Sequence, residues 1–151
     1  MYNAVNQVIS THGASEVAVV GHSLGGGIAM FDAMSLRLRL PSNIGVRFIG
    51  YGTPRVGNKA WADFVDTQLP GNVTRINNWK DPIPIVPPMF IGYHHPSGEI
   101  HVQGNTGSEE WVACPGQEYS SAQCSDGAVR TVFSGELADH DGPYNGILLK
   151  C

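Results

Sequence analysis

Residues 16–29, EVAVVGHSLGGGIA, join two different sequence patterns across a turn. Residues 17–20 form a short apolar run of the kind expected for a strand that is covered on both faces. Residues 28–40 are rich in helix-forming residues, contain no glycine or proline, and stop at Pro41. The stretch therefore predicts a buried parallel strand, a sharp turn and a helix.

The turn itself reads Gly21-His22-Ser23-Leu24-Gly25 and satisfies the pattern G-x-S-x-G. In this pattern the glycines let strand and helix pack closely around a serine whose strained backbone exposes the hydroxyl. The Leu24 N–H at the start of the helix has no intrahelical partner, so it is a candidate oxyanion donor. Ser23 is the candidate nucleophile, although a chain with 19 glycines could also contain this pattern as a simple tight turn.

A nucleophilic serine needs a base and an acid, which follow it in the order acid, then histidine, in this type of fold. Asp81 comes shortly after residues 73–78, which read as a strand, and open parallel sheets bind ligands at this edge. Pro82 disfavours helix at Asp81, although an aspartate before proline is also an ordinary turn opener. Asp63 and Asp66 lie in an amphipathic helical pattern, where a solvated face explains them better.

Three histidines lie close together after this acid. His94 and His95 precede a turn, and His101 lies in the alternating strand pattern of residues 99–103. With Glu99, they also raise the alternative of a metal site. Their spacing matches no zinc signature, so we interpret them as hydrogen-bonded structural histidines and predict no metal ligand.

His140 is the remaining candidate for the base. It lies in the polar, turn-rich stretch 137–144 near the end of the chain, where position and flexibility suit a catalytic base. A lone histidine between two aspartates is more often a solvated surface residue, so this assignment depends on Ser23 and Asp81. The chain contains no P-loop and no dinucleotide fingerprint, and no cofactor is predicted.

The sequence resembles the fungal class 3 lipases, a family of α/β-hydrolases that includes triacylglycerol lipases and feruloyl esterases. The resemblance implies that Ser23 is the nucleophile, Asp81 the acid, His140 the base, and the Leu24 amide an oxyanion donor. It also suggests that Ile83 and Val86 contact the acyl group. The blocks that carry the resemblance are residues 21–26 (GHSLGG), 51–58 (YGTPRVGN), 81–84 (DPIP) with 87–88 (PP), 92–95 (GYHH), 99–100 (EI) and 139–140 (DH).

The resemblance covers nearly all of residues 1–151 but only about the C-terminal half of the family's single domain. Residues 1–9 look like the interior of a helix. We therefore expect an incomplete α/β-hydrolase fold, without the N-terminal strands, the second oxyanion donor and the lid. The expected strands are three of parallel type, residues 17–20, 44–50 and 73–78, which leave an apolar edge exposed, and a hairpin of residues 99–103 and 110–114.

The three cysteines bear on the cellular compartment. As similar cysteines do in the family, Cys114 and Cys124 could close the polar loop between them, and Cys151 would pair with a cysteine upstream of this chain. Three free thiols in a cytosolic protein are the alternative. Asn72, in the sequon Asn-Val-Thr, is a candidate glycosylation site and adds weak support for secretion.

Charge and hydropathy exclude other classes of function. A net charge of −4 and a pI near 5.8 argue against nucleic-acid partners. No apolar stretch approaches the ~18 residues of a transmembrane segment.

The apolar residues that follow Asp81, between residues 83 and 91, suit an acyl chain, and about half of them should face the pocket. However, Asp141 occupies a position where many relatives carry an apolar residue, and a charge there disfavours a long alkyl chain. We predict a secreted triacylglycerol lipase that acts on lipid or other ester substrates at a lipid–water interface. The alternatives are a feruloyl or other carboxylester esterase, and a truncated, non-catalytic product that binds lipid or a partner.

Overall fold

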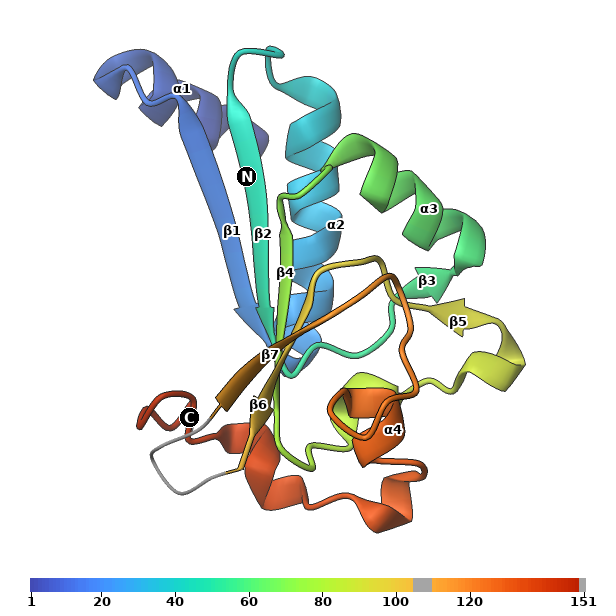
Figure 1. Cartoon of the computed structure of the whole chain (residues 1–151). Coiled ribbons are helices and arrows are strands. Elements are labelled where there is room, and N and C mark those ends of the chain that lie inside the picture. Colours follow the sequence, from blue (N-terminus) through green and yellow to red (C-terminus); the bar gives the residue numbers. More distant parts are fainter. Residues whose placement is uncertain (105–109, 150–151) are drawn as a thin grey trace.

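The computed structural model describes residues 1–104 and 110–149. Its centre is a five-stranded sheet whose first four strands run parallel and whose last strand runs antiparallel (Figure 1). The sequence predicted one parallel strand too few, because residues 99–103 pair both with the preceding parallel strand and with their hairpin partner. The strand order is β1 (Glu16–His22), β2 (Gly45–Tyr51), β4 (Val73–Asn78), β6 (Glu99–Gln103) and β7 (Glu110–Cys114).

Three helices pack beside this sheet: α1 (Tyr2–His12), α2 (Ser23–Arg39) and α3 (Lys59–Gln68). The predicted helices are confirmed, although α2 starts at the serine itself, five residues earlier than the pattern indicated. Its apolar face lies in the main core, in which Ala33 and Phe48 are completely buried. The shorter elements are β3 (Gly57–Asn58), η1 (Ile83–Ile85), η2 (Met89–Ile91), β5 (Tyr93–His94), α4 (Ser125–Ala128), η3 (Val132–Ser134) and η4 (Leu137–Asp141).

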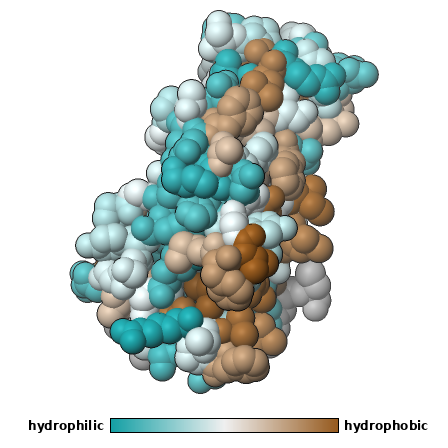
Figure 2. Space-filling model, turned by 90° about the vertical axis from the view of Figure 1, so that its right-hand side faces the viewer, coloured by the Kyte–Doolittle hydropathy of each residue, from teal (hydrophilic) through white to brown (hydrophobic). Residues whose placement is uncertain are grey.

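The prediction that β1 is covered on both faces is wrong for the described chain. Val17 and Val19 pack against the main core, whereas Ala18 is exposed and Val20 is 56% exposed. The reason is that β1 is the edge strand of the described sheet, with helices packed on only one of its faces. Large apolar side chains also remain exposed elsewhere, and Figure 2 shows such side chains in both the upper and the lower half of one side of the molecule.

A second apolar cluster connects the sheet to the last part of the described chain. Tyr144 is buried with Ile76 and Val102, and the half-buried Leu149 packs against them. This cluster holds the stretch after η4 against β4 and β6. It therefore fixes the polypeptide that carries His140 near the carboxyl ends of the parallel strands.

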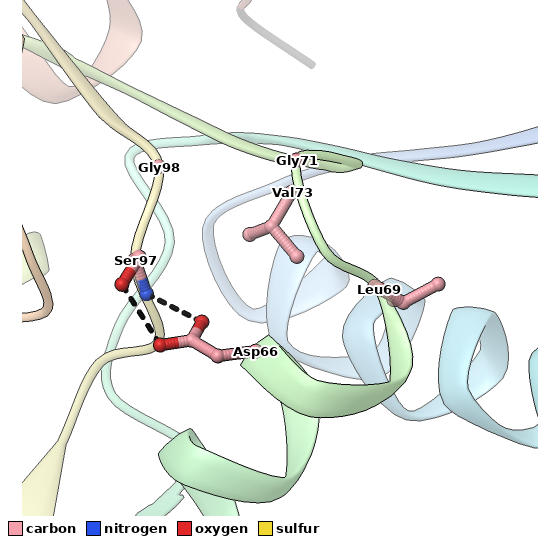
Figure 3. Close-up of a pocket in the computed structure, with 6 residues that line it drawn as sticks. All are labelled: Asp66, Leu69, Gly71, Val73, Ser97 and Gly98. Atoms are coloured by element: carbon pink, nitrogen blue, oxygen red, sulfur yellow. Dashed lines mark hydrogen bonds between the residues drawn. The ribbon is translucent and has the colours of Figure 1, made fainter.

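The sequence suggested that Asp66 lies on a solvated helix face, but the structure shows it in a hydrogen-bonded contact. Its carboxylate accepts hydrogen bonds from the Ser97 N–H and hydroxyl, both at 2.8 Å, and from the Gln117 side chain at 2.9 Å. Figure 3 shows Asp66 pointing from α3 toward Ser97 across a hollow of about 260 Å³. This hollow lies where β4 and β6 begin, at the opposite end of the sheet from Asp81. Asp66 therefore stabilises the fold far from the candidate site.

No helix among the described residues is both long and apolar enough to cross a membrane.

Candidate active site

Ser23 occupies the turn between β1 and α2 in a strained backbone conformation. Its φ of +56° lies in the left-handed region, which a non-glycine residue rarely adopts. Gly21 makes this turn feasible, because a Cβ there would lie 2.4 Å from the Gly25 carbonyl oxygen. Gly26 has a similar role, since its Cβ would lie 2.3 Å from Thr53 Oγ1. In contrast, a Cβ at Gly25 would meet no described atom within 4 Å. Packing therefore requires glycine at positions 21 and 26 but not at position 25.

The structure brings Ser23, Asp81 and His140 into one line of hydrogen bonds. His140 Nε2 lies 2.7 Å from Ser23 Oγ, and His140 Nδ1 lies 2.9 Å from Asp81 Oδ2. Because a carboxylate only accepts, Nδ1 carries the proton, and Nε2 accepts from the serine hydroxyl. The other carboxylate oxygen of Asp81 accepts the Ile83 N–H at 2.8 Å. Both Asp81 oxygens are thereby engaged, and the residue is 2% exposed.

The loops that carry the acid and the histidine are tied directly to each other. Asp139 Oδ2 accepts the Lys80 N–H at 3.2 Å, and the Lys80 carbonyl accepts the Glu136 N–H at 2.8 Å. The side chain of Asn78 donates to the Asp139 carbonyl at 2.9 Å. Sequence reasoning missed these contacts, and the only available signal was that Asn78 and Asp139 lie close in sequence to Asp81 and His140.

Gly52 leaves room for the contact between Asp81 and His140. It follows β2 with a φ of +52°. A Cβ at this position would lie 2.7 Å from Asp81 Oδ2 and 2.8 Å from His140 Nδ1. No side chain other than hydrogen fits between the strand end and these two groups.

Leu24 is the first residue after Ser23 in α2, so its N–H belongs to the orphan donors of the helix start. The first turn of α2 contains no acidic residue, which leaves the positive end of the helix dipole free to attract an anion. Leu24 is 71% exposed, so the start of α2 is open to solvent at this residue.

A buried charge cluster holds the loop that follows Asp81. Arg55 donates to the carbonyls of Ile85 at 2.5 Å and Pro87 at 3.1 Å. It also forms ion pairs with Glu118 at 2.8 Å and Asp126 at 2.5 Å. Arg55 lies in the stretch 51–58 that resembles the family, but sequence gave no sign of its carboxylate partners, which lie more than sixty residues away.

Two neighbouring carboxyls in this cluster titrate differently. Burial and the adjacent Glu118 raise the pKa of Asp126 to about 7. Burial alone would raise the pKa of Glu118 too, but hydrogen bonds from Arg55 and Asp126 lower it to about 2. Below neutral pH Asp126 therefore holds a proton and binds Arg55 as a neutral hydrogen-bond acceptor, whereas Glu118 carries the negative charge that pairs with Arg55.

The apolar residues after Asp81 lie in different surroundings. Val86 lines a cavity of about 800 Å³, whereas Ile83 is half-buried and lies outside its lining. Ile85, Met89 and Phe90 also line this cavity, so four of the six apolar residues between 83 and 91 face it. The lining does not include Ser23, Asp81 or His140, so the cavity is a neighbour of the hydrogen-bonded line and not its continuation.

The histidines between residues 94 and 101 bond to backbone carbonyls. His95 Nε2 lies 2.8 Å from the Pro84 carbonyl oxygen, and His101 Nε2 lies 2.7 Å from that of Trp79. Burial, and the charge of Arg75, hold the pKa of His95 well below its usual value. These two histidines therefore support the loop on either side of Asp81. The acidic residue beside them, Glu99, approaches Cys114 and Cys124, but these two sulfurs are bonded to each other.

Cys114 and Cys124 form a disulfide that closes the loop carrying Glu118. Asn72 is exposed in the turn before β4, and its side-chain amide donates to the Pro70 carbonyl at 3.1 Å. Cys151 lies outside the described residues.

Comparison with known proteins identifies the family. A sequence profile described as Lipase (class 3) matches residues 1–91, which is more than half of the chain. The chain belongs to the class 3 lipase family. A curated relative of this class 3 lipase chain is the secreted mono- and diacylglycerol lipase MDL2 of Malassezia globosa, which is 34% identical over 130 residues. That match covers 86% of the chain and 40% of the relative.

Solved lipase structures share its fold. The lipase from Rhizopus microsporus var. chinensis superposes with a TM-score of 0.79 at 30% identity, covering 97% of the chain and 49% of that protein. A triacylglycerol lipase, described as having a serine protease triad as its catalytic centre, gives 0.82 at 30% identity, with coverage of 99% and 54%. The class 3 lipase chain thus has the α/β-hydrolase fold and spans about half the length of these relatives.

Proposed function

We propose that the protein carrying this chain hydrolyses carboxylic esters, with Ser23 as nucleophile, His140 as general base and Asp81 as the acid that orients it. The observation that carries this proposal is the line of hydrogen bonds of 2.7 Å and 2.9 Å on a serine with a φ of +56°. A nucleophile bonded to a base that is itself oriented by a third group is the arrangement that activates a hydroxyl. Family membership supports the same chemistry.

In the first half of the reaction, Ser23 Oγ attacks the ester carbonyl carbon while its proton passes to His140 Nε2. The carbonyl oxygen gains negative charge, and the Leu24 N–H at the start of α2 is the proposed donor to it. His140 then returns the proton to the alkoxide leaving group as the C–O bond breaks. An alcohol leaves, and the acyl group remains on Ser23.

In the second half, water replaces the alcohol. His140 Nε2 takes a proton from the water as its oxygen attacks the acyl carbon, and the same donor holds the developing oxyanion. The proton then returns to Ser23 Oγ as the acyl–enzyme bond breaks, which releases a carboxylic acid. Asp81 remains ionised throughout and stabilises the imidazolium that forms in each half.

We propose acylglycerols as the substrate class. Relatives are named as mono- and diacylglycerol lipases and as a triacylglycerol lipase. Ile83 is the proposed acyl contact nearest the site, because its own N–H is bonded to Asp81. Val86 is the proposed second contact, at the edge of the apolar cavity. The names of secreted relatives and the disulfide also support an extracellular location.

The test compares variants of the proposed acid, Asp81, and of a control aspartate, Asp63, with a variant of the proposed nucleophile, Ser23. Mass spectrometry should locate a fluorophosphonate adduct on Ser23, and Ser23→Ala should abolish labelling. Asp81→Asn should slow hydrolysis by ~10⁴-fold. The matched control Asp63→Asn, which changes an exposed aspartate paired with Lys59, should leave the rate unchanged. Hydrolysis that survives in Ser23→Ala would refute the proposal.

A substrate panel separates the alternatives. Trioleoyl-, dioleoyl- and monooleoylglycerol should be cleaved faster than methyl ferulate. Faster cleavage of the ferulate would identify a feruloyl esterase that uses the same residues. Binding of acylglycerol without labelling of Ser23 would indicate a non-catalytic lipid-binding protein.

A further inference from the structure

The residue before the candidate nucleophile contacts the candidate base. His22 ends β1 in an extended conformation, with φ −113° and ψ 142°, directly before the strained Ser23. Its imidazole lies against that of His140, with ring centroids 4.5 Å apart and ring planes tilted by 32°. Both residues of one tight turn therefore contact His140, one at its reacting nitrogen and one at its ring face.

The polar contact of His22 is with backbone, not with the reacting atoms. His22 Nε2 lies 2.8 Å from the carbonyl oxygen of His140. Because this oxygen only accepts, His22 carries its proton on Nε2 and donates it. The Tyr144 hydroxyl donates to the same oxygen at 3.3 Å, and burial together with nearby Asp81 raises the pKa of this hydroxyl, which keeps it protonated.

The hydrogen bonds from His22 and Tyr144 restrain the main chain of His140. Its ring is bonded at Nδ1 to Asp81 and at Nε2 to Ser23, and its main chain is held by His22 and Tyr144. During the reaction Nε2 alternately gains and loses a proton, so its bond to Ser23 is repeatedly broken. The contact at the carbonyl stays intact through these steps, since it involves no transferred proton.

We propose that His22 is a positioning residue that holds the main chain and ring of His140 while Nε2 transfers protons. This inference rests on the proposed function, because it assigns His140 the role of base. It concerns His22, the first x in G-x-S-x-G, which no step of the mechanism uses. The donor and the ring of His22 have separate tasks, and separate variants can remove each of them.

Two substitutions at position 22 and one control test the proposal on the protein that carries this chain. His22→Phe keeps an aromatic ring against His140 but removes the donor, whereas His22→Gln restores a donor of similar reach. His12→Phe makes the same change on an exposed histidine at the end of α1. The measurements are kcat and KM on a dispersed acylglycerol, fluorophosphonate labelling of Ser23, and thermal unfolding.

We expect His22→Phe to lower kcat by roughly 10-fold with little change in KM, since one hydrogen bond is lost without loss of a substrate contact. His22→Gln should recover most of this loss, with the remaining deficit measuring the lost ring contact, and His12→Phe should match the wild type. Wild-type kcat in His22→Phe, with Ser23 labelled normally, would overturn the inference and leave the proposed function intact. Equal losses in the Phe and Gln variants that follow the unfolded fraction would also overturn it. Absence of labelling in the wild type would instead refute the proposed function and the inference with it.

Discussion

Replacing Gly52 with alanine should separate the acid from the base while the fold persists. The new methyl carbon would lie 2.7 Å from Asp81 Oδ2 and 2.8 Å from His140 Nδ1. Non-bonded heavy atoms prefer about 3.5 Å, so each group must retreat by roughly 0.7 Å, which disrupts their 2.9 Å contact. Misplacement of about 1 Å costs roughly 100-fold in rate, and full loss of the acid's orienting role costs ~10⁴-fold. We therefore expect kcat to fall by about 10²- to 10⁴-fold.

Gly13→Ala provides the matched control for this variant. Gly13 also has a positive φ, +65°, but a Cβ there meets nothing within 4 Å. Both variants should lose about 1–2 kcal/mol of unfolding free energy from left-handed strain, measured by urea denaturation. Only Gly52→Ala should lose activity, measured as kcat and as the rate of fluorophosphonate labelling at Ser23. A Gly52→Ala protein with kcat within about threefold of the wild type would refute the steric reasoning.

Three further predictions concern the ties around the site. The pKa of Asp126 is about 7 in the folded state against an ordinary 3.8, so the contribution of Asp126 to the free energy of unfolding declines as pH rises from about 4 to 7. Asp126→Asn should remove this decline when the free energy of unfolding is measured by urea denaturation at successive pH values. An unchanged pH dependence in the variant would contradict the raised pKa. Asp139→Ala deletes the acceptor for the Lys80 N–H and should lower kcat by about 10-fold, whereas Asp139→Asn keeps an acceptor and should retain activity. Equal losses of kcat in the two variants would show that this hydrogen bond does not position the loop. Arg55→Met leaves two buried carboxyls without their cation and should cost about 3–5 kcal/mol of unfolding free energy, and a loss under ~1 kcal/mol would contradict the buried ion pair.

The local patterns of the sequence were sufficient to predict most of the fold. The strand–turn–helix at residues 16–29, the helix predicted at 59–66 and the hairpin of β6 and β7 are confirmed, because each follows from hydrophobic periodicity and turn residues within one short segment. The parallel pairing of β6 with β4 was missed, since nothing in residues 99–103 states which strand lies on their other side. An exposed apolar edge was expected from the incomplete sheet, but the apolar run of residues 17–20 did not identify β1 as that edge, so the exposure of Val20 was misjudged.

The candidate site likewise contains residues that the sequence could predict and contacts that it could not. Ser23, Asp81 and His140 could be proposed because residue type, chain order and flanking elements restrict each choice, and the structure brings the three together. Gly52 and Arg55 could not be assigned their contacts, since each acts through partners at least 29 residues away and neither sequence periodicity nor turn chemistry records such pairs.

Most of the polar residues that sequence reasoning missed share one physical task, which is to hold the loop around Asp81. Asp81 is 2% exposed, yet its neighbours on both sides are fixed mainly by polar contacts: Lys80 through Asp139, and the carbonyl of Ile85 through Arg55. Apolar packing is tolerant of small shifts, whereas hydrogen bonds weaken steeply with distance and angle, so polar ties are better suited to hold an acid within hydrogen-bonding distance of a base. Buried polar groups without such partners would destabilise the protein, which requires the ties to be complete. The main core under α2 therefore sets where the strands end, and the polar ties around Asp81 and His140 set the distances on which the proposed proton transfer depends.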